Sequence, residues 1–196
     1  MEVKSLCTDM YRIRDFFPID QFYSIVDEFN EYHPTYVKKE KSNHTNGYYE
    51  GIVKGPSRIG DNLSLIAPST NISLAIKKII KPEHNIELYR VNTNIMHPGQ
   101  SSDFHTDSGI LQDNVTEYGW TFLLFCSTEW NTHWGGEFCF QAEDGEYNYC
   151  PYIPGDCILF RACRQHRACE TSLSSQQPRH TVAWTFSSPG IIDNTY

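Results

Sequence analysis

Residues 135–161 decide the fold, and they read GGEFCFQAEDGEYNYCPYIPGDCILFR. Three runs of strand length, rich in apolar and aromatic residues, occupy 137–141, 146–151 and 157–161. Asp144-Gly145 and Pro154-Gly155 separate these runs, and such pairs form tight turns because glycine accepts a positive φ and proline restricts its own. The stretch therefore predicts short strands joined by turns. Runs of the same character lie at 86–96, 120–127 and 180–187.

The N-terminal part of the chain predicts two helices. Between residues 15 and 31 apolar side chains recur every three or four positions, which is typical of an amphipathic helix, and this helix should begin around 18–20. A second helix has Ser69 or Thr70 as its N-cap and stops before Pro82.

This order of elements predicts a mostly β fold with supporting helices packed on an antiparallel sandwich or barrel. No repeat or linker divides the 196 residues, so we expect a single domain, 1–196. Helical support should cover about 1–85 and the β core about 86–188. The polar segment 32–68 contains a strand-like run at 48–53 and is expected to form loops, a hairpin or a mobile cover.

Composition argues against several functional classes. The net charge of -8 provides no excess positive field for phosphate backbones, so nucleic-acid binding is not expected. No segment approaches the roughly 20 apolar residues of a membrane span, and the N-terminus does not resemble a signal peptide, so we expect a soluble, cytoplasmic protein. The seven cysteines are an odd number and are expected to be reduced thiols.

A candidate metal site begins with His105-Thr106-Asp107. Residues two apart on an extended backbone point to the same side, so one strand end can present an imidazole and a carboxylate to one ion. Two histidines and one carboxylate with open coordination positions favour Fe(II) that activates oxygen. By itself the pair is also compatible with a hydrogen-bonded turn.

Three histidines compete to be the third ligand. His133 lies in a turn-like stretch, where a surface role is the simpler interpretation. His180 would point out of a barrel if its neighbours Arg179 and Thr181 point in. His166 follows the turn and strand at 154–160 and is the preferred candidate.

Arg179-His180-Thr181 suits a dicarboxylate co-substrate. A planar guanidinium binds a carboxylate through two donors, and the Thr181 hydroxyl two residues later lies on the same face of a strand. An arginine paired with a surface carboxylate is the alternative at this point.

Taken in order, these pieces resemble the 2-oxoglutarate- and Fe(II)-dependent oxygenases of the prolyl 4-hydroxylase-like superfamily. The resemblance covers about 88–187 and implies a double-stranded β-helix, also called a jelly roll or cupin-like fold. The matching landmarks are Pro98-Gly99 before His105 and Asp107, the Thr121-led apolar strand, Trp130 with Gly135-Gly136-Glu137, the 152–160 turn and strand, His166, and Arg179 with Thr181 and Trp184.

The resemblance implies roles for individual residues. It makes His105, Asp107 and His166 the iron ligands, and Arg179 with Thr181 the clamp on the far carboxylate of 2-oxoglutarate. Thr121 is expected to contact the co-substrate as well. Met96 stands where many relatives have a tyrosine, so a phenolic contact would be missing or come from Tyr89. The polar stretch between His166 and Arg179 also suggests a longer loop than usual.

The implied activity is a hydroxylase that couples decarboxylation of 2-oxoglutarate to succinate with hydroxylation of a substrate C–H bond. Fe(II), 2-oxoglutarate and O2 would be needed, with ascorbate as a further requirement in some relatives. Asp107 favours hydroxylation because related halogenases have a small residue in its place. The substrate would be prolyl, another peptide or amino-acid-like.

Several alternatives stay open. The same iron centre in this family also supports desaturation, demethylation or ring closure, and the substrate could be a small metabolite. A non-catalytic cupin-like iron and 2-oxoglutarate sensor would keep the ligands without turnover. A structural zinc site would use Cys150, Cys157, Cys163 and Cys169, although their wide spacing does not match common zinc motifs.

Overall fold

The computed structural model describes residues 1–31, 35–37, 48–55, 58–59, 67–80, 85–107 and 119–187. Its elements in chain order are β1 (Glu2–Cys7), β2 (Met10–Arg14), α1 (Ile19–Glu31), β3 (Thr35–Val37), β4 (Tyr48–Gly55), β5 (Arg58–Ile59), α3 (Ser69–Ile80), β6 (Glu87–Met96), β7 (Trp120–Phe125), the 3-10 helix η2 (Thr132–Trp134), β8 (Phe138–Gln141), β9 (Tyr147–Cys150), β10 (Cys157–Arg161), β11 (His166–Ala168) and β12 (Arg179–Ser187).

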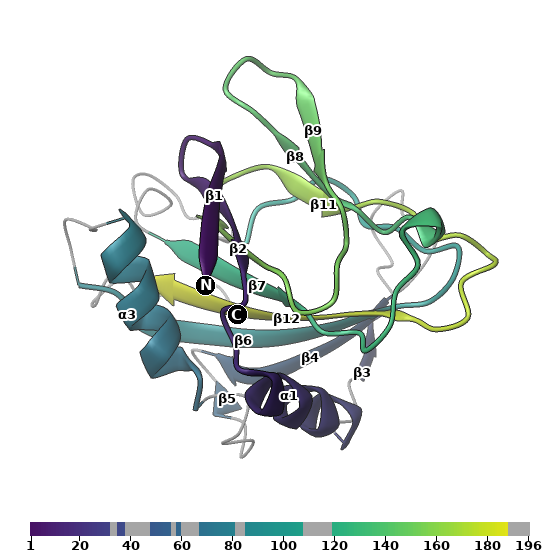
Figure 1. The fold of residues 1–196 in the computed structure, drawn as a ribbon, viewed down its shortest axis with the longest axis horizontal. Helices are drawn as coiled ribbons and strands as arrows, with labels where there is room; N and C mark the ends of the chain where they lie inside the picture. The colour runs from purple at the N-terminus through teal and green to yellow at the C-terminus, as the bar shows by residue number, and fades with distance from the viewer. Residues whose placement is uncertain are drawn as a thin grey trace.

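The strands form two antiparallel sheets. The large sheet has the order β1-β2-β10-β7-β12-β6-β4-β3, with β5 paired to β4. The small sheet has the order β11-β8-β9. Figure 1 shows α1 and α3 on one side of the large sheet and the small sheet on the other. This is the jelly-roll arrangement that the sequence predicts.

Alternation along the central strands explains why they are apolar on both faces. In β7, Phe122 and Leu124 point toward the helices, whereas Leu123 and Phe125 point into the space between the two sheets. Strand β10 alternates in the same way. A large apolar side chain that is fully buried contributes about 1.5–3 kcal/mol, so both faces of these strands stabilise the fold.

Two cores result from this alternation. The helix-side core buries Phe22, Val26 and Phe29 of α1, with Ile72 and Ile76 of α3, against the large sheet. The core between the sheets buries an aromatic set: Phe125, Phe138, Phe140, Tyr152 and Phe160. The second core closes one end of the space between the sheets and positions the site described below.

The two predicted helices are confirmed, but the N-terminal region is not only helical. Strands β1 and β2 form a hairpin, and β2 pairs with β10 of the large sheet. The apolar pattern did not indicate this hairpin because β1 is an edge strand in which polar and apolar residues are mixed and the first four residues are exposed. In β2 the buried residues Met10 and Ile13 are three positions apart, which is not strand periodicity.

Most of the predicted cover, 32–68, lies outside the described residues, apart from β3, β4 and β5 and residues 67–68. Strand β4 confirms the strand-like run at 48–53. No helix in the described part of the chain is long and apolar enough to cross a membrane.

Candidate metal and co-substrate site

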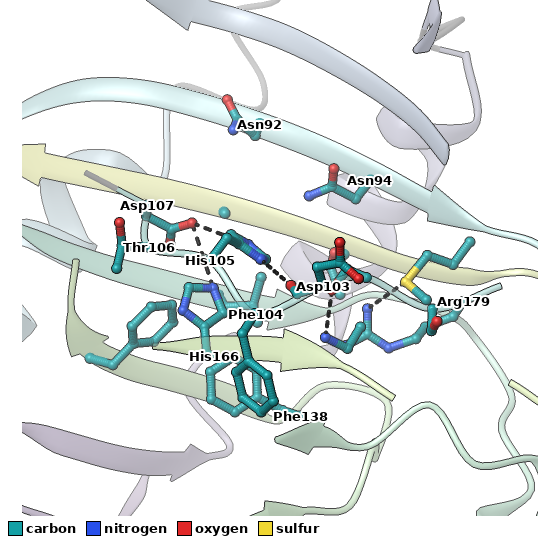
Figure 2. A pocket seen from close by; sticks show the side chains of 18 of the residues that line it. Asn92, Asn94, Asp103, Phe104, His105, Thr106, Asp107, Phe138, His166 and Arg179 are labelled. Atoms are coloured by element: carbon teal, nitrogen blue, oxygen red, sulfur yellow. Dashed lines mark hydrogen bonds and ion pairs between the residues drawn. The ribbon is translucent and has the colours of Figure 1, made fainter. Parts of the chain in front are cut away.

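A cavity of about 460 Å³ contains the predicted site residues. Its walls are the inward faces of β6 and β12, the segment 101–107, and side chains from β7, β8, β10 and β11 (Figure 2). His105, Asp107 and His166 lie at one part of this wall, and Arg179 and Thr181 line the same cavity.

His105 and His166 face each other because their backbones are paired. The amide of each residue donates to the carbonyl of the other at 3.0 Å, which extends the small sheet by one bridge. Residues directly opposite in an antiparallel pair place their side chains on the same face. The two imidazole centroids are therefore 4.4 Å apart.

Each imidazole is also fixed in a tautomer that suits metal binding. His105 Nδ1 is 2.8 Å from the Asp103 carbonyl, and His166 Nδ1 is 2.9 Å from the Arg164 carbonyl. A carbonyl only accepts, so each Nδ1 carries the proton and each Nε2 keeps a free lone pair. Phe138 and Phe160 pack on the His166 ring at 5.2 Å and 4.6 Å and hold its orientation.

Asp107 completes the group. Its Oδ1 is 3.9 Å from His105 Nε2 and 3.6 Å from His166 Nε2. Burial raises the pKa of Asp107, but His166, His105 and Arg90 together lower it by more. The pKa of this carboxyl therefore lies below its usual value. Burial lowers the pKa of His166 to about 4, which keeps its imidazole neutral near pH 7. The site therefore combines an ionised carboxylate with a neutral His166 imidazole.

This arrangement fits a divalent first-row metal. The ligand atoms of His105, Asp107 and His166 all lie within 4.8 Å of one another, and no other cluster of at least three such ligands occurs among the described residues. Metal–ligand bonds of about 2.0–2.2 Å place adjacent ligand atoms about 3 Å apart, so these three side chains would move slightly closer together on one ion. The donor set is the two-histidine, one-carboxylate set of non-haem Fe(II) sites.

The structure separates the three competing histidines. His133 lies in η2 and is exposed. His180 points to the helix side, where its ring stacks on Phe29 of α1 at 4.7 Å. Only His166 joins His105 and Asp107, as preferred from the sequence.

Arg179 is a buried cation without a carboxylate partner. Its side chain is 3% exposed, and it forms no ion pair with any carboxylate that the structure describes. Nε donates to the Gly136 carbonyl at 2.8 Å, and the guanidinium lies 4.8 Å from the Tyr152 ring and 5.6 Å from the Phe125 ring. Burial lowers the Arg179 pKa, yet arginine stays protonated in proteins. An anionic ligand would compensate this charge.

The Gly135-Gly136 landmark has a structural reason. Gly136 has φ +74°, and a Cβ at this position would lie 3.1 Å from Arg179 Cδ and 3.2 Å from the Trp130 ring. Glycine therefore allows the backbone carbonyl to approach and hold the guanidinium.

The remaining predicted contacts have different outcomes. Thr181 lines the cavity two residues after Arg179, on the same face of β12. Thr121 is buried but does not line the cavity, so the structure gives no support to its predicted co-substrate contact. Tyr89 belongs to β6, but its side chain lies outside the described residues, so its contact stays a prediction.

Strand β6 contributes three residues that sequence reasoning missed. Arg90, Asn92 and Asn94 alternate along β6 and line the cavity, together with Met96. Arg90 Nη2 donates to the Asp107 carbonyl at 3.1 Å, and Arg179 Nη1 lies 3.9 Å from Met96 Sδ. The alternation of polar residues in 90–96 is visible in the sequence and was the available signal.

The three arginines near His166 contact different groups. Arg161 pairs with Asp9 and Arg164 with Glu143, whereas Arg167 packs over Phe104, a cavity residue. The zinc alternative is not supported, because the cysteines proposed for it form no ligand cluster in the described part of the chain.

Comparison with known proteins agrees with this geometry. Residues 91–186 match the family model described as the 2OG-Fe(II) oxygenase superfamily. No curated protein matches the sequence.

Several solved structures share the fold at low sequence identity. A prolyl-4-hydroxylase from Pseudomonas putida is 16% identical, with 93% of this chain and 94% of that chain covered and a TM-score of 0.66. A prolyl hydroxylase from Trichoplax adhaerens, in complex with a hypoxia inducible factor peptide fragment, is 12% identical, with 91% and 84% covered and a TM-score of 0.68. HygX from Streptomyces hygroscopicus, with nickel, 2-oxoglutarate and hygromycin B bound, is 12% identical, with 93% and 84% covered and a TM-score of 0.66.

Proposed function

The chain belongs to the 2OG-Fe(II) oxygenase superfamily, and on that premise we propose that it hydroxylates a C–H bond of a prolyl, other peptide or amino-acid-like substrate. His105, Asp107 and His166 are the proposed iron ligands. Arg179 and Thr181 are the proposed contacts to the far carboxylate of 2-oxoglutarate. One observation carries the proposal: a three-ligand metal group lines the same cavity as a buried guanidinium that forms no ion pair within the described part of the chain.

Each proposed role follows from the chemistry of the residue. The fixed Nδ1 protons direct both Nε2 lone pairs toward the metal, and ionised Asp107 supplies the single negative charge. Arg179 binds and orients the far carboxylate of 2-oxoglutarate through a charge-assisted contact, with the Thr181 hydroxyl beside it. With iron and 2-oxoglutarate bound, the site would supply O2 chemistry: O2 is the oxidant, one of its oxygen atoms ends in succinate as 2-oxoglutarate loses CO2, and the other ends in the hydroxylated substrate.

The remaining wall residues are suited to exclude water and orient a substrate. Leu123, Phe138 and Phe160 form the apolar part of the wall, which lowers the local polarity around the reacting centre. Asn92 and Asn94 place amide groups on the opposite part of the wall, and a side-chain amide both donates and accepts hydrogen bonds.

Two substrate classes have support. The peptide class is supported by the fold shared with prolyl hydroxylases, one of which is in complex with a peptide fragment. Hydroxylation of a small metabolite is the second candidate, because HygX has the same fold with hygromycin B bound. The presence of Asp107 in the ligand group supports hydroxylation in either case. Peptides and small metabolites would be offered separately and the products measured by mass spectrometry. The class whose mass increases by one oxygen atom is the substrate class.

The metal assignment is tested by two histidine variants. His166→Ala should lose Mn(II) binding and Fe(II)-dependent succinate formation, because it removes one of three ligands. The control is His180→Ala, which changes a partly buried histidine on the helix side and should keep Mn(II) binding. Electron paramagnetic resonance measures the bound Mn(II). Retention in His166→Ala together with loss in His180→Ala would contradict the assignment.

A further inference from the structure

Met96 lies in direct contact with the proposed co-substrate anchor. It ends β6 opposite Arg179, the first residue of β12, and both side chains line the cavity. The Met96 sulfur is in contact with the Arg179 guanidinium, with Sδ 3.9 Å from Nη1. A thioether is a weak acceptor, so it satisfies a charged donor poorly.

The other contacts of Arg179 provide few acceptor atoms for Nη1. Gly136 accepts from Nε, and Tyr152 and Phe125 cover the guanidinium with aromatic rings rather than with acceptor oxygens. Tyr152 directs its hydroxyl to Ser127 and the His180 carbonyl instead. An acceptor created on the Met96 sulfur would therefore lie beside a buried cation that has no anionic partner among the described residues.

We propose that Met96 is a site of reversible oxidation, and that its sulfoxide occupies Arg179 and weakens the binding of 2-oxoglutarate. The inference rests on the proposed role of Arg179 as the carboxylate anchor. The oxidant is a peroxide. The sulfur lone pair attacks one oxygen of hydrogen peroxide, the O–O bond breaks and an S=O bond forms. Sulfur loses two electrons, and the second oxygen leaves as water with both hydrogens.

The sulfoxide is a stronger hydrogen-bond acceptor for Arg179 than the thioether is. Oxidation converts an apolar side chain into a polar one, with an oxygen that accepts strong hydrogen bonds. A charge-assisted hydrogen bond from Arg179 Nη1 to this oxygen would compete with the carboxylate of 2-oxoglutarate. Because methionine sulfoxide is enzymatically reducible, the effect is reversible.

The chain provides internal controls, because it has only three methionines. Met1 is 58% exposed, Met96 is 5% exposed but lines the cavity, and Met10 is 0% exposed and packs in the core between the sheets. We expect oxidation of Met1 first, then Met96, with Met10 protected. Bound 2-oxoglutarate should protect Met96 and leave the oxidation of Met1 unchanged.

The experiment treats the metal-free full chain with hydrogen peroxide, restores the cysteines with dithiothreitol and maps sulfoxides by peptide mass spectrometry. Calorimetry with Mn(II) then measures the Kd for 2-oxoglutarate. Oxidised protein should bind 2-oxoglutarate at least about tenfold more weakly, which corresponds to about 1.4 kcal/mol. Methionine sulfoxide reductase should restore the affinity, whereas dithiothreitol alone should not.

Met96→Leu is the matched variant, because leucine is apolar and similar in volume to methionine but has no sulfur to oxidise. All seven cysteines stay in place. Peroxide treatment should leave the Kd of this variant for 2-oxoglutarate unchanged. The inference is overturned if Met96 is as resistant as Met10, or if its sulfoxide leaves the Kd unchanged. If untreated protein with Mn(II) does not bind 2-oxoglutarate, the proposed function fails, and this inference fails with it.

Discussion

At the scale of single residues, position in the sheets decides what each histidine does. His166 and His180 are both largely buried, and burial lowers the pKa of each to about 4. His166 faces a carboxylate across the cavity, whereas His180 packs on an aromatic ring and is close to a second histidine, His97, which lowers its pKa further. The same neutral imidazole is a candidate ligand in one place and a packing residue in the other.

His180 should make the folded protein sensitive to acid. The unfolded residue binds a proton below pH 6.5, but the folded residue resists protonation until about pH 4. Stability is therefore fully present above pH 6.5 and is lost as the pH falls toward 4. Between pH 7 and pH 5, His180 should lower the unfolding free energy of the wild type by about 1–2 kcal/mol. His180→Phe keeps a ring on Phe29 and should lack this part of the decrease.

Urea denaturation of both metal-free proteins at several pH values measures this difference. His166 is present in both and contributes equally to both curves, so the difference between the slopes reports His180 alone. Parallel curves for wild type and His180→Phe between pH 7 and pH 5 would show that His180 does not titrate in this way.

Residue identities were predictable where short spacing fixed the geometry. His105 with Asp107 and Arg179 with Thr181 are each two apart, so extended backbone alone places each pair on one face. His166 was harder to predict because its approach to His105 depends on pairing between distant segments. The contact of Met96 with Arg179 has the same origin: β6 and β12 are neighbours in the sheet but far apart in the chain.

At the scale of elements, turns before strands set the position of the functional side chains. Gly136 precedes β8, and its carbonyl holds Arg179 Nε. Gly136→Ala would strain a positive φ and press a Cβ on the arginine side chain. We expect the Kd for 2-oxoglutarate to rise at least about tenfold, or about 1.4 kcal/mol, while Mn(II) binding stays unchanged.

Gly145→Ala is the matched control for this variant. Gly145 has a similar positive φ of +85°, but a Cβ there would meet no atom within 4 Å. Both variants carry comparable backbone strain, so a difference in calorimetric affinity isolates the contact with Arg179. Equal affinities in the two variants would argue against a specific role for Gly136.

Elements were predictable from sequence when they are long and apolar. Strands β7, β10 and β12 have apolar side chains in two cores, and α1 and α3 have an apolar face, so their patterns are strong. The three-residue strand β11 and the edge strand β1 have no such pattern. Their pairing partners, rather than their own composition, make them strands.

At the scale of the whole molecule, the N-terminal hairpin joins the core of the large sheet. The family match covers 91–186, yet β2 pairs with β10 and buries Met10 and Ile13 among residues of that region. Arg12 of β2 also pairs with Asp156, which precedes β10 and is itself buried. These contacts support our proposal that the chain folds as a single domain rather than as a core with an independent N-terminal extension.

A single domain should unfold in one step, whichever part is weakened. Ile13→Ala in β2 and Leu159→Ala in β10 both remove fully buried side chains and should each cost about 2–5 kcal/mol. Both should shift one common urea transition seen by tryptophan fluorescence and far-ultraviolet circular dichroism. Val3→Ala in exposed β1 should cost less than about 0.5 kcal/mol. Because β2 and β10 share one hydrogen-bonded edge, a second transition specific to Ile13→Ala would mean that the hairpin unfolds separately from the oxygenase core.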